Sequence, residues 1–253
     1  ALAMVKEQTT NTNGQTARRG FGWRPDFPNI RDYHPHSSEL PDRVMASGQK
    51  ETIRSMYKRM GLGESKSPTL PPSVDLRQWC PPVEDQFDLG SCTANAAVSL
   101  VEYFELRAFD KHIDASRLFV YKATRNLMKE TGDTGAFLRS TMGALVLFGA
   151  PPEEYWPYNI NDFDKEPPAF CYAFGQSFQS LLYYRLDPLG TNTDVLLKRI
   201  KLCLAAGLPS MFGFTGYSSI RQASSTGKIP FPVPGERLEG GHAIVAVGFA
   251  AKM

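Results

Sequence analysis

The sequence contains little cysteine and little histidine, with four residues of each among 253. The cysteines form no CxxC pair, and no histidines accompany them at zinc-ligand spacing, so we expect no structural zinc site. If one cysteine is a free nucleophile, at most one disulfide can form among the others. The redox compartment is therefore undetermined, with a secreted or periplasmic location slightly favoured over the cytoplasm. The cysteines are Cys80, Cys92, Cys171 and Cys203.

Strong charge and long apolar runs are also missing. The net charge is +2, and no dense stripe of lysine and arginine with interleaved aromatics is present, so nucleic acid is not an expected partner. No apolar run approaches the roughly 18 residues that span a bilayer, and we expect a soluble protein with no membrane partner. The length and the hydrophobic content of 42% allow a sizeable core. No feature indicates oligomerisation, so a monomer is expected.

Residues 1–72 differ in composition from the rest and are predicted to form an N-terminal extension. After a polar, turn-rich start, "FGWRPDFPNIRDYHPH" alternates aromatic residues with prolines, which favours extended backbone. This pattern is typical of an arm laid over another surface. Residues 53–60 place apolar side chains on one helical stripe, closed by Gly61, which predicts a short helix. The linker composition of "GLGESKSPTLPPS" places a boundary near Pro72.

Residues 73–175 are predicted to form a mainly helical part. Apolar residues recur at three- and four-residue steps after Cys92, which predicts a mostly buried helix. The second predicted helix takes Asp114 or Ser116 as its cap, and the third is ended by a glycine. The three predicted helices cover residues 92–109, 114–129 and 137–149.

Residues 176–253 are predicted to form a mainly β part. The stretch "QSFQSLLYYRLD" has strand-like content, and "LPSMFGFTGY" and "HAIVAVGF" are typical of buried strands. One helix fits residues 191–207, with Thr191 as its cap and Asp194 at the capping-box position. Helices followed by strands indicate an α+β fold.

Cys92 stands where the long buried helix begins. A helix N-terminus favours the thiolate, and a nearby imidazolium completes the activation and delivers the proton to the leaving group. Three of the histidines lie in polar, surface-like contexts: His34, His36 and His112. His242 lies between glycines and a buried strand, and it is the candidate partner. The alternative is that Cys92 is a packed core thiol and His242 a residue that satisfies a local hydrogen bond.

Taken together, Gln86, Gly90, Ser91, Cys92 and the downstream "GGHAIVAVGF" resemble the active-site segments of papain-like cysteine peptidases, the cathepsin family. Cys92 and His242 are 150 residues apart, within the family's usual spacing of about 130–150. The resemblance covers roughly residues 73–249 and is strongest to the short bacterial members. It implies a two-lobed fold, with a helical lobe, a β-barrel-like lobe and an active-site cleft between them. It requires neither a metal nor an organic cofactor.

The resemblance also implies roles for single residues. Cys92 matches the nucleophile, His242 its general acid and base, and Gln86 the oxyanion-hole donor that acts with the backbone N–H of Cys92. Two positions match the place where the family holds a substrate backbone as an extended strand, and four match the surroundings of the principal specificity pocket, whose apolar or small lining suggests a hydrophobic preference. These six substrate-binding candidates are Gly135, Ala136, Phe137, Leu138, Gly241 and Ala243.

Three departures from the family pattern stand out. Leu89 replaces a cysteine whose disulfide usually ties the nucleophile loop, so packing must hold the loop instead. Thr93 replaces a large aromatic residue. No asparagine that could orient His242 follows it before Met253, which indicates missing C-terminal strands, a different orienting group or an inactive chain; we favour the first.

The expected activity is that of a cysteine endopeptidase, which hydrolyses a peptide or protein substrate through a thioester acyl-enzyme. One alternative is a catalytically inactive papain-fold protein that binds peptides. Another is a transamidase or a deubiquitinase-like enzyme with the same thiol chemistry. The arm in residues 1–72 either lies through the cleft as a pro-segment or packs elsewhere as a structural brace.

Overall fold

We describe a computed structural model of the chain, which covers residues 20–62 and 69–250. Predictions on the polar start of the sequence, on the linker around residues 63–68 and on the last three residues lie outside the described residues. The described residues form two compact units. The first unit comprises 20–26, Arg77–Ser180 and Met211–Ala246, and the second comprises 27–62, 69–76, Leu181–Ser210 and 247–250. The three-part division near Pro72 stays a prediction.

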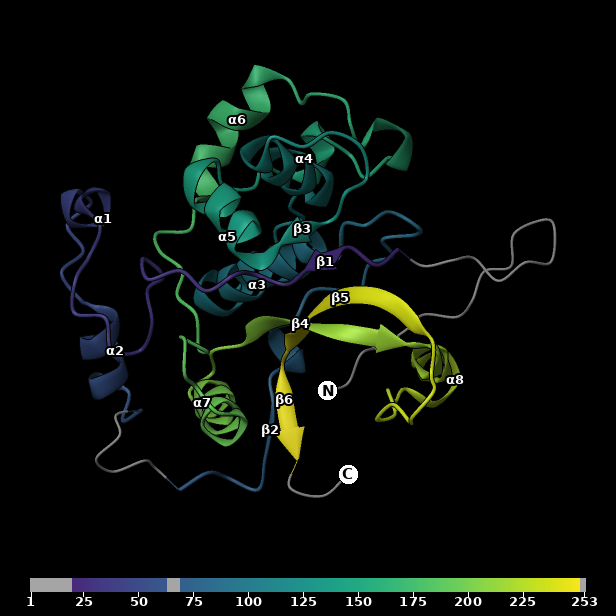
Figure 1. The fold of residues 1–253 in the computed structure, drawn as a ribbon. Helices are drawn as coiled ribbons and strands as arrows, with labels where there is room; N and C mark the ends of the chain where they lie inside the picture. Colours follow the sequence, from purple (N-terminus) through teal and green to yellow (C-terminus); the bar gives the residue numbers. More distant parts are fainter. Residues whose placement is uncertain (1–19, 63–68, 251–253) are drawn as a thin grey trace. The chain divides into compact units, whose positions relative to one another are not determined.

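Helices dominate the first unit (Figure 1). The three predicted helices are confirmed, and α4 takes Ser116 as its cap, because the Ser116 side chain accepts the N–H of Phe119 at 3.1 Å. The main core forms where these helices bury their apolar residues against one another. The α-helices of this unit are α3 (Cys92–Phe109), α4 (Arg117–Met128), α5 (Leu138–Leu147), α6 (Ala169–Gly175) and α8 (Ala223–Thr226). Short 3₁₀ turns are η2 (Arg77–Trp79), η3 (Glu153–Tyr155), η4 (Ile160–Asp162), η5 (Gln176–Phe178) and η6 (Ser218–Gln222).

Two pairs of strands complete the first unit. β1 (Trp23–Arg24) pairs in parallel with β3 (Ala136–Phe137), so that Trp23 lies opposite Ala136. β4 (Ser210–Tyr217), whose first residue belongs to the second unit, pairs with β5 (Leu238–Ala246), and β5 packs against α3. The predicted strands at these positions are confirmed. Within residues 20–62 and 69–250 the strands are paired in two-stranded sheets.

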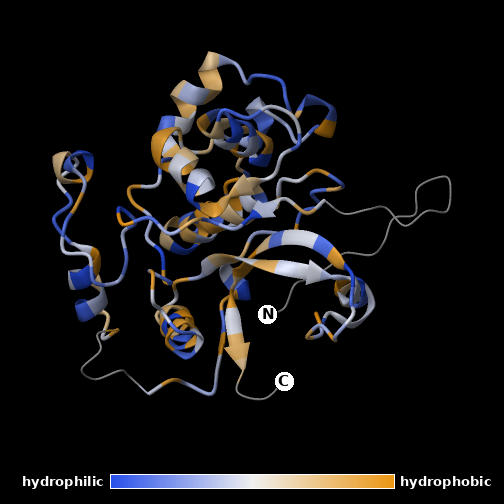
Figure 2. Ribbon diagram, viewed as in Figure 1, coloured by the Kyte–Doolittle hydropathy of each residue, from blue (hydrophilic) through white to orange (hydrophobic). Residues whose placement is uncertain are grey.

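The second unit has a smaller core. Tyr57 on α2 donates or accepts a hydrogen bond with Cys203 on α7 at 3.3 Å, and Ile53 and Leu202 are buried beside them. Helix α7 shows both apolar and polar residues along its length, whereas β6 is almost wholly apolar (Figure 2). The elements are α1 (Asp42–Ala46), α2 (Ile53–Arg59), α7 (Thr193–Ala205), and the antiparallel strands β2 (Ser73–Asp75) and β6 (Gly248–Ala250).

Two local predictions were wrong. Residues 176–187 form no strand: their side chains at 182, 184 and 186 pack on the second core, but their backbone finds no ladder partner. Helix α7 is capped by Asn192 rather than Thr191, because the Asn192 side chain accepts the N–H of Val195 at 2.9 Å. Asparagine is at least as good a cap as threonine, and it lies one position nearer to the first helical residue.

The overall fold is α+β, as predicted, with all four cysteines unpaired. Among the described residues, no helix combines the length and the apolar character that crossing a membrane requires.

Glu102 is a carboxyl group buried inside the first unit. It lies on α3, is 3% exposed and accepts the N–H of Ala115 at 2.9 Å. Burial, supported by the charges of Glu84 and Asp114, raises its pKa to about 8. The folded chain therefore holds a proton that the unfolded chain has lost above its ordinary pKa near 4.5.

We expect the stability of the chain to fall as the pH rises from about 5 to about 8, because the unfolded state binds fewer protons over this window. Glu102→Gln keeps an acceptor for Ala115 but cannot ionise. The variant should gain stability over the wild type by several kcal/mol at full titration, since one pKa unit corresponds to about 1.4 kcal/mol. Urea unfolding at several pH values measures the difference. Glu154→Gln, at an exposed position, is the control. If the free energy of unfolding changed with pH equally in Glu102→Gln and in the wild type, the prediction would be contradicted.

Candidate active site

Cys92 is the first residue of α3 and is 1% exposed. Its position at the helix N-terminus, which favours an anionic sulfur, follows the sequence prediction. The residues packed around it come from segments far apart in the sequence, because α3 lies against β5. They are Trp23, Ala96, Leu138, Met211, Ala243 and Val245.

His242 lies on β5, next to Ala243, which packs against Cys92. The imidazole is flanked by the edges of two aromatic rings, with centroid distances of 5.7 Å to Phe21 and 5.8 Å to Phe214. Its Nδ1 atom is buried and has no hydrogen-bond partner. Within the described part of the chain, no hydrogen bond joins His242 to Cys92. The structure thus places the two predicted residues beside the same apolar segment without a hydrogen bond between them.

Burial keeps both groups neutral. It raises the pKa of the Cys92 thiol, and the backbone amides of Ala243 and Gly22 only partly offset this. It lowers the pKa of His242 to about 4. A thiolate–imidazolium pair needs the opposite shift of both pKa values. Burial thus opposes formation of that pair in this arrangement.

The N-terminal arm, residues 20–26, contributes to this burial and belongs to the same unit. The carbonyl of Gly22 accepts the N–H of Ala136 at 2.7 Å, and a Cβ atom on Gly22 would collide with the carbonyl of Gly90. Phe21 covers His242, and Trp23 packs beside Cys92. The arm backbone thus enters the site at a distance that only glycine permits.

Charges fix the arm on both sides of β1. The guanidinium of Arg24 donates to both carboxylate oxygens of Glu130, at 2.6 and 2.8 Å, and lies 4.4 Å from the centroid of the Phe137 ring. Arg139 pairs with Asp26 at 3.5 Å and also donates its backbone N–H to that carboxylate. These polar contacts fix the position of the arm backbone, which apolar packing alone does not specify.

Gln86 also contacts the arm. Its side-chain amide donates to the carbonyl of Gly20 at 2.8 Å and to that of Leu89 at 2.9 Å. The donor proposed for an oxyanion is therefore occupied by a peptide carbonyl of the chain itself.

The six predicted substrate-binding residues all lie around the arm. A Cβ atom on Gly135, whose φ is +68°, would collide with the carbonyl of Gly22, and one on Gly241 would collide with that of Trp23. Of the other four residues, two form β3, the strand that pairs with β1, and one of these also carries the aromatic ring that contacts Arg24. The remaining two belong to the apolar cluster around Cys92. These are Ala136, Phe137, Leu138 and Ala243.

The departures at Leu89 and Thr93 are absorbed by packing. Leu89 is 5% exposed and belongs to the main core. Thr93 is fully buried and accepts a hydrogen bond from Thr141 at 3.1 Å. Sequence reasoning missed that Phe21 and Trp23 lie inside the site; the aromatic and proline alternation signalled only that this segment is extended.

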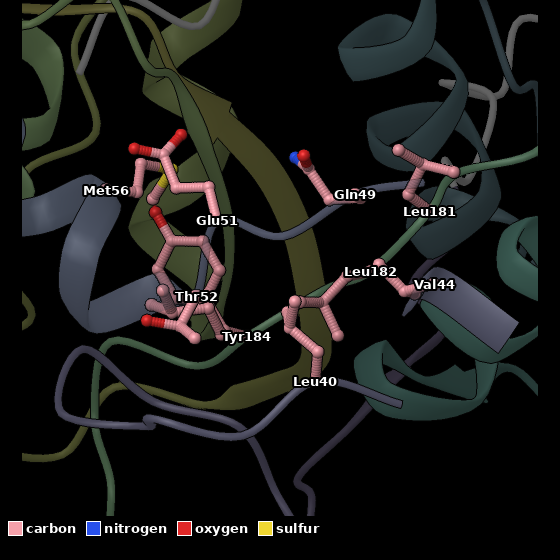
Figure 3. Close-up of a pocket in the computed structure, with 10 residues that line it drawn as sticks. Leu40, Val44, Gln49, Glu51, Thr52, Met56, Leu181, Leu182 and Tyr184 are labelled. Carbon is pink, nitrogen blue, oxygen red and sulfur yellow. The ribbon is translucent and has the colours of Figure 1, made fainter. Parts of the chain in front are cut away.

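Two other features carry no reactive group. The carboxylates of Glu84, Asp114 and Glu153 converge within 4.8 Å, but Arg117 pairs with Glu84 at 2.6 Å and with Glu153 at 3.1 Å, which supplies the compensating charge. The second unit contains a pocket with the apolar side chains of Leu40, Val44, Leu181 and Leu182 on one side (Figure 3). Its acidic residue, Glu51, is paired with Arg59 at 2.7 Å.

Two kinds of comparison with known proteins indicate the family. No family model matches the chain. A curated relative, the uncharacterized peptidase C1-like protein L477 of Acanthamoeba polyphaga mimivirus, is 30% identical over 244 residues, which cover 92% of this chain and 74% of the relative. Among solved structures, xylellain, a cysteine protease from Xylella fastidiosa, is similar with a TM-score of 0.67 and 28% identity, covering 99% of this chain and 84% of that one.

More distant structures share the fold. Procathepsin B S9 from Trypanosoma congolense has a TM-score of 0.58 at 16% identity, covering 96% of this chain and 77% of that one. Procathepsin L 3 from the larval midgut of Tenebrio molitor has a TM-score of 0.56 at 16% identity, covering 74% and 58%. Fold and comparisons together define an α+β protein of the papain type. The chain belongs to the papain-like cysteine peptidase family, peptidase C1.

We expect Gly22→Ala to displace the arm, because the added methyl group cannot fit against the carbonyl of Gly90. In the full chain, alkylation of Cys92 by iodoacetamide should accelerate by roughly tenfold or more, as a thiol released from burial ionises more readily. Mass spectrometry locates the adduct. Gly143→Ala, where the helix leaves open space for a methyl group, is the matched control; an unchanged rate in Gly22→Ala would contradict the prediction.

Proposed function

We propose that the chain is a cysteine endopeptidase that hydrolyses peptide bonds through a thioester acyl-enzyme. The observation that carries the proposal is the pairing of β1 with β3 beside Cys92 and His242: the site already holds an extended peptide backbone next to a thiol at a helix N-terminus. A substrate that replaces the arm would meet the same backbone groups.

The proposed reaction begins when the arm leaves and solvent reaches the site. The Cys92 thiol then transfers its proton to His242, and the thiolate attacks the substrate carbonyl. Charge develops on the carbonyl oxygen, where the amide of Gln86 and the backbone N–H of Cys92 donate to it. His242 returns the proton to the departing amine, which leaves a thioester on Cys92. Water, deprotonated by His242, hydrolyses the thioester and releases the acid.

Phe214 gives His242 a fixed neighbour that does not depend on the arm. Its ring meets the imidazole at an interplanar angle of 76°, and it belongs to β4, the partner strand of β5. We infer that this edge contact restricts rotation of the imidazole after Phe21 has left with the arm.

The proposed substrates carry an apolar side chain where Trp23 now packs. The surrounding residues Leu138, Met211 and Ala243 offer apolar surface, and the indole Nε1 of Trp23 is buried without a hydrogen-bond partner. Burying an N–H donor without an acceptor costs free energy, and a side chain that has no donor avoids this cost. Phenylalanine or leucine should therefore be accepted better than tryptophan.

The arm is proposed to act as a resident competitor for the same backbone contacts. The occupied Gln86 amide and the covered His242 support this role over that of a brace. A non-catalytic peptide-binding protein is the second candidate, favoured by the neutral state of both groups and by the missing Cys92–His242 hydrogen bond. A transamidase or deubiquitinase-like enzyme would use the same chemistry, with an amine or a ubiquitin conjugate as substrate.

Variants in the Gly22→Ala background test the proposed roles. Cys92→Ala and His242→Ala should abolish hydrolysis of fluorogenic peptides, and Gln86→Ala should lower kcat by about 100- to 1,000-fold, the usual effect of losing one oxyanion donor. Gln179→Ala removes an amide that donates to Leu147 and should leave kcat unchanged. Equal activity of Gln86→Ala and Gln179→Ala would contradict the role of Gln86.

An epoxysuccinyl peptide, which alkylates activated thiolates, distinguishes enzyme from binding protein. Labelling confined to Cys92 in the Gly22→Ala chain supports the enzyme. Peptide binding without labelling or hydrolysis supports the second candidate. Faster aminolysis than hydrolysis, or a preference for ubiquitin conjugates over short peptides, would identify the third.

A further inference from the structure

A chain of hydrogen bonds joins the nucleophile turn, which is formed by residues 87–91 before Cys92, to Gly135. Gly135 directly precedes β3, the strand that pairs with the arm. The carboxylate of Asp133 accepts the N–H of Gly90 at 2.9 and 3.0 Å. The hydroxyl of Tyr121 donates to Asp133 at 2.5 Å and accepts the N–H of Gly135 at 3.1 Å. We propose that Asp133 and Tyr121 are positioning residues that fix the nucleophile turn relative to the substrate-binding strand. This inference rests on the proposed function.

The bonded backbone groups lie next to the proposed chemistry. Gly90 precedes Cys92 by two residues, and the orientation of its peptide plane helps to set the direction of the Cys92 N–H, a proposed oxyanion donor. Gly135 precedes Ala136, whose N–H holds the arm carbonyl. A shift of about 1 Å in either group would misplace a donor for the transition state. Both glycines and Tyr121 are buried, whereas Asp133 is exposed and reaches the Gly90 N–H from the surface.

Packing alone cannot supply this alignment. Leu89 fills the core beside the turn, but apolar contacts have no preferred direction for a neighbouring N–H. All four cysteines are unpaired, so no disulfide ties the turn either. The Asp133 carboxylate accepts the Gly90 N–H at both oxygens, and such a hydrogen bond is directional and charge-assisted.

The other end of the hydrogen-bond chain is firmly held by α4. Arg125 lies one turn after Tyr121 on the same helix face, and its guanidinium is 4.3 Å from the centroid of the Tyr121 ring. Arg125 donates to the carbonyl of Gly132 at 2.5 Å and pairs with Asp164 at 2.7 Å. Asp164 in turn accepts the N–H of Gly132 at 3.0 Å. The turn that carries Asp133 is thus fixed from a fully buried arginine.

Tyr158 also forms hydrogen bonds with the nucleophile turn, but unlike Asp133 and Tyr121 it does not link the turn to β3. Its hydroxyl is 2.6 Å from the hydroxyl of Ser91 and donates to the carbonyl of Gln86 at 3.1 Å. These bonds hold the turn but do not reach β3. Asp133 and Tyr121 are the pair that connects both parts of the site.

The test measures amide exchange and turnover separately. In the full chain, Asp133→Ala should accelerate hydrogen exchange at the Gly90 amide by about tenfold or more, measured by NMR, because a buried donor loses its acceptor. Asp133→Asn keeps one acceptor oxygen and should restore much of the protection. Tyr121→Phe should accelerate exchange at Gly135. Tyr172→Phe removes a hydroxyl of the same core that bonds to Glu166 and should change neither amide.

Turnover is then measured in the Gly22→Ala background. Asp133→Ala should lower kcat by about 10- to 100-fold with little change in KM, as expected for a misplaced transition-state donor. Alkylation of Cys92 by iodoacetamide needs no oxyanion donor and should stay within about twofold.

The outcomes separate the inference from the proposed function. Unchanged exchange at Gly90 in Asp133→Ala overturns the inference whatever the activity. An equal loss of alkylation and turnover also overturns it, because it indicates general damage to the site. A Gly22→Ala chain that hydrolyses no peptide overturns the proposed function and with it the catalytic part of the inference, while the exchange data still decide whether Asp133 fixes the turn.

Discussion

The approach of the Gly22 backbone to the carbonyl of Gly90 and to Gly135 is the constraint on which the rest of the site depends. It lets the arm pair with β3, and the paired arm then brings Phe21 onto the imidazole and Trp23 beside the thiol. Gly22 shares this requirement with Gly135 and Gly241, where an added Cβ atom would also collide with the arm backbone.

Sealing the site has an electrostatic consequence that reaches beyond steric blockage. A thiol and an imidazole that would exchange a proton in water both lose the favourable solvation of their charged forms, so each stays neutral. Under the proposed function, the arm would therefore suppress the ionisation of Cys92 as well as block access to it. Cys92 lies at the N-terminus of α3, whose partial positive charge would favour the thiolate once the site is solvated.

Much of the architecture followed from periodicity and end signals in the sequence. Helix α3 was predicted with its observed bounds because small and apolar residues recur along it without interruption, and β4 and β5 were predicted from buried apolar runs. The failures have local causes. Residues 176–187 have the alternation of a strand but no partner backbone, and Asn192 lies one position nearer to the helix start than Thr191. Pairing partners and exact caps depend on tertiary context that a pattern does not contain.

The candidate site was predicted in part. The helix start and the contexts of the histidines indicated Cys92 and His242, and the resemblance added Gln86. Nothing in the residue pattern indicated that Trp23 packs beside Cys92 or that Asp133 accepts the Gly90 N–H. Such contacts join segments more than forty residues apart in the sequence, and an aspartate in a turn has many equally plausible partners until the backbone is known.

The arm continues without a break from Asp26 into the described segment that begins at Phe27. Under the proposed function, residues 20–26 would stay tethered after leaving the site, and an entering peptide would compete with this segment of the same chain. The effective concentration of such a rival is typically in the millimolar range for a short flexible tether. Dilution of the protein cannot weaken this competition, so permanent opening requires either cleavage of the tether or a new binding place for the displaced segment.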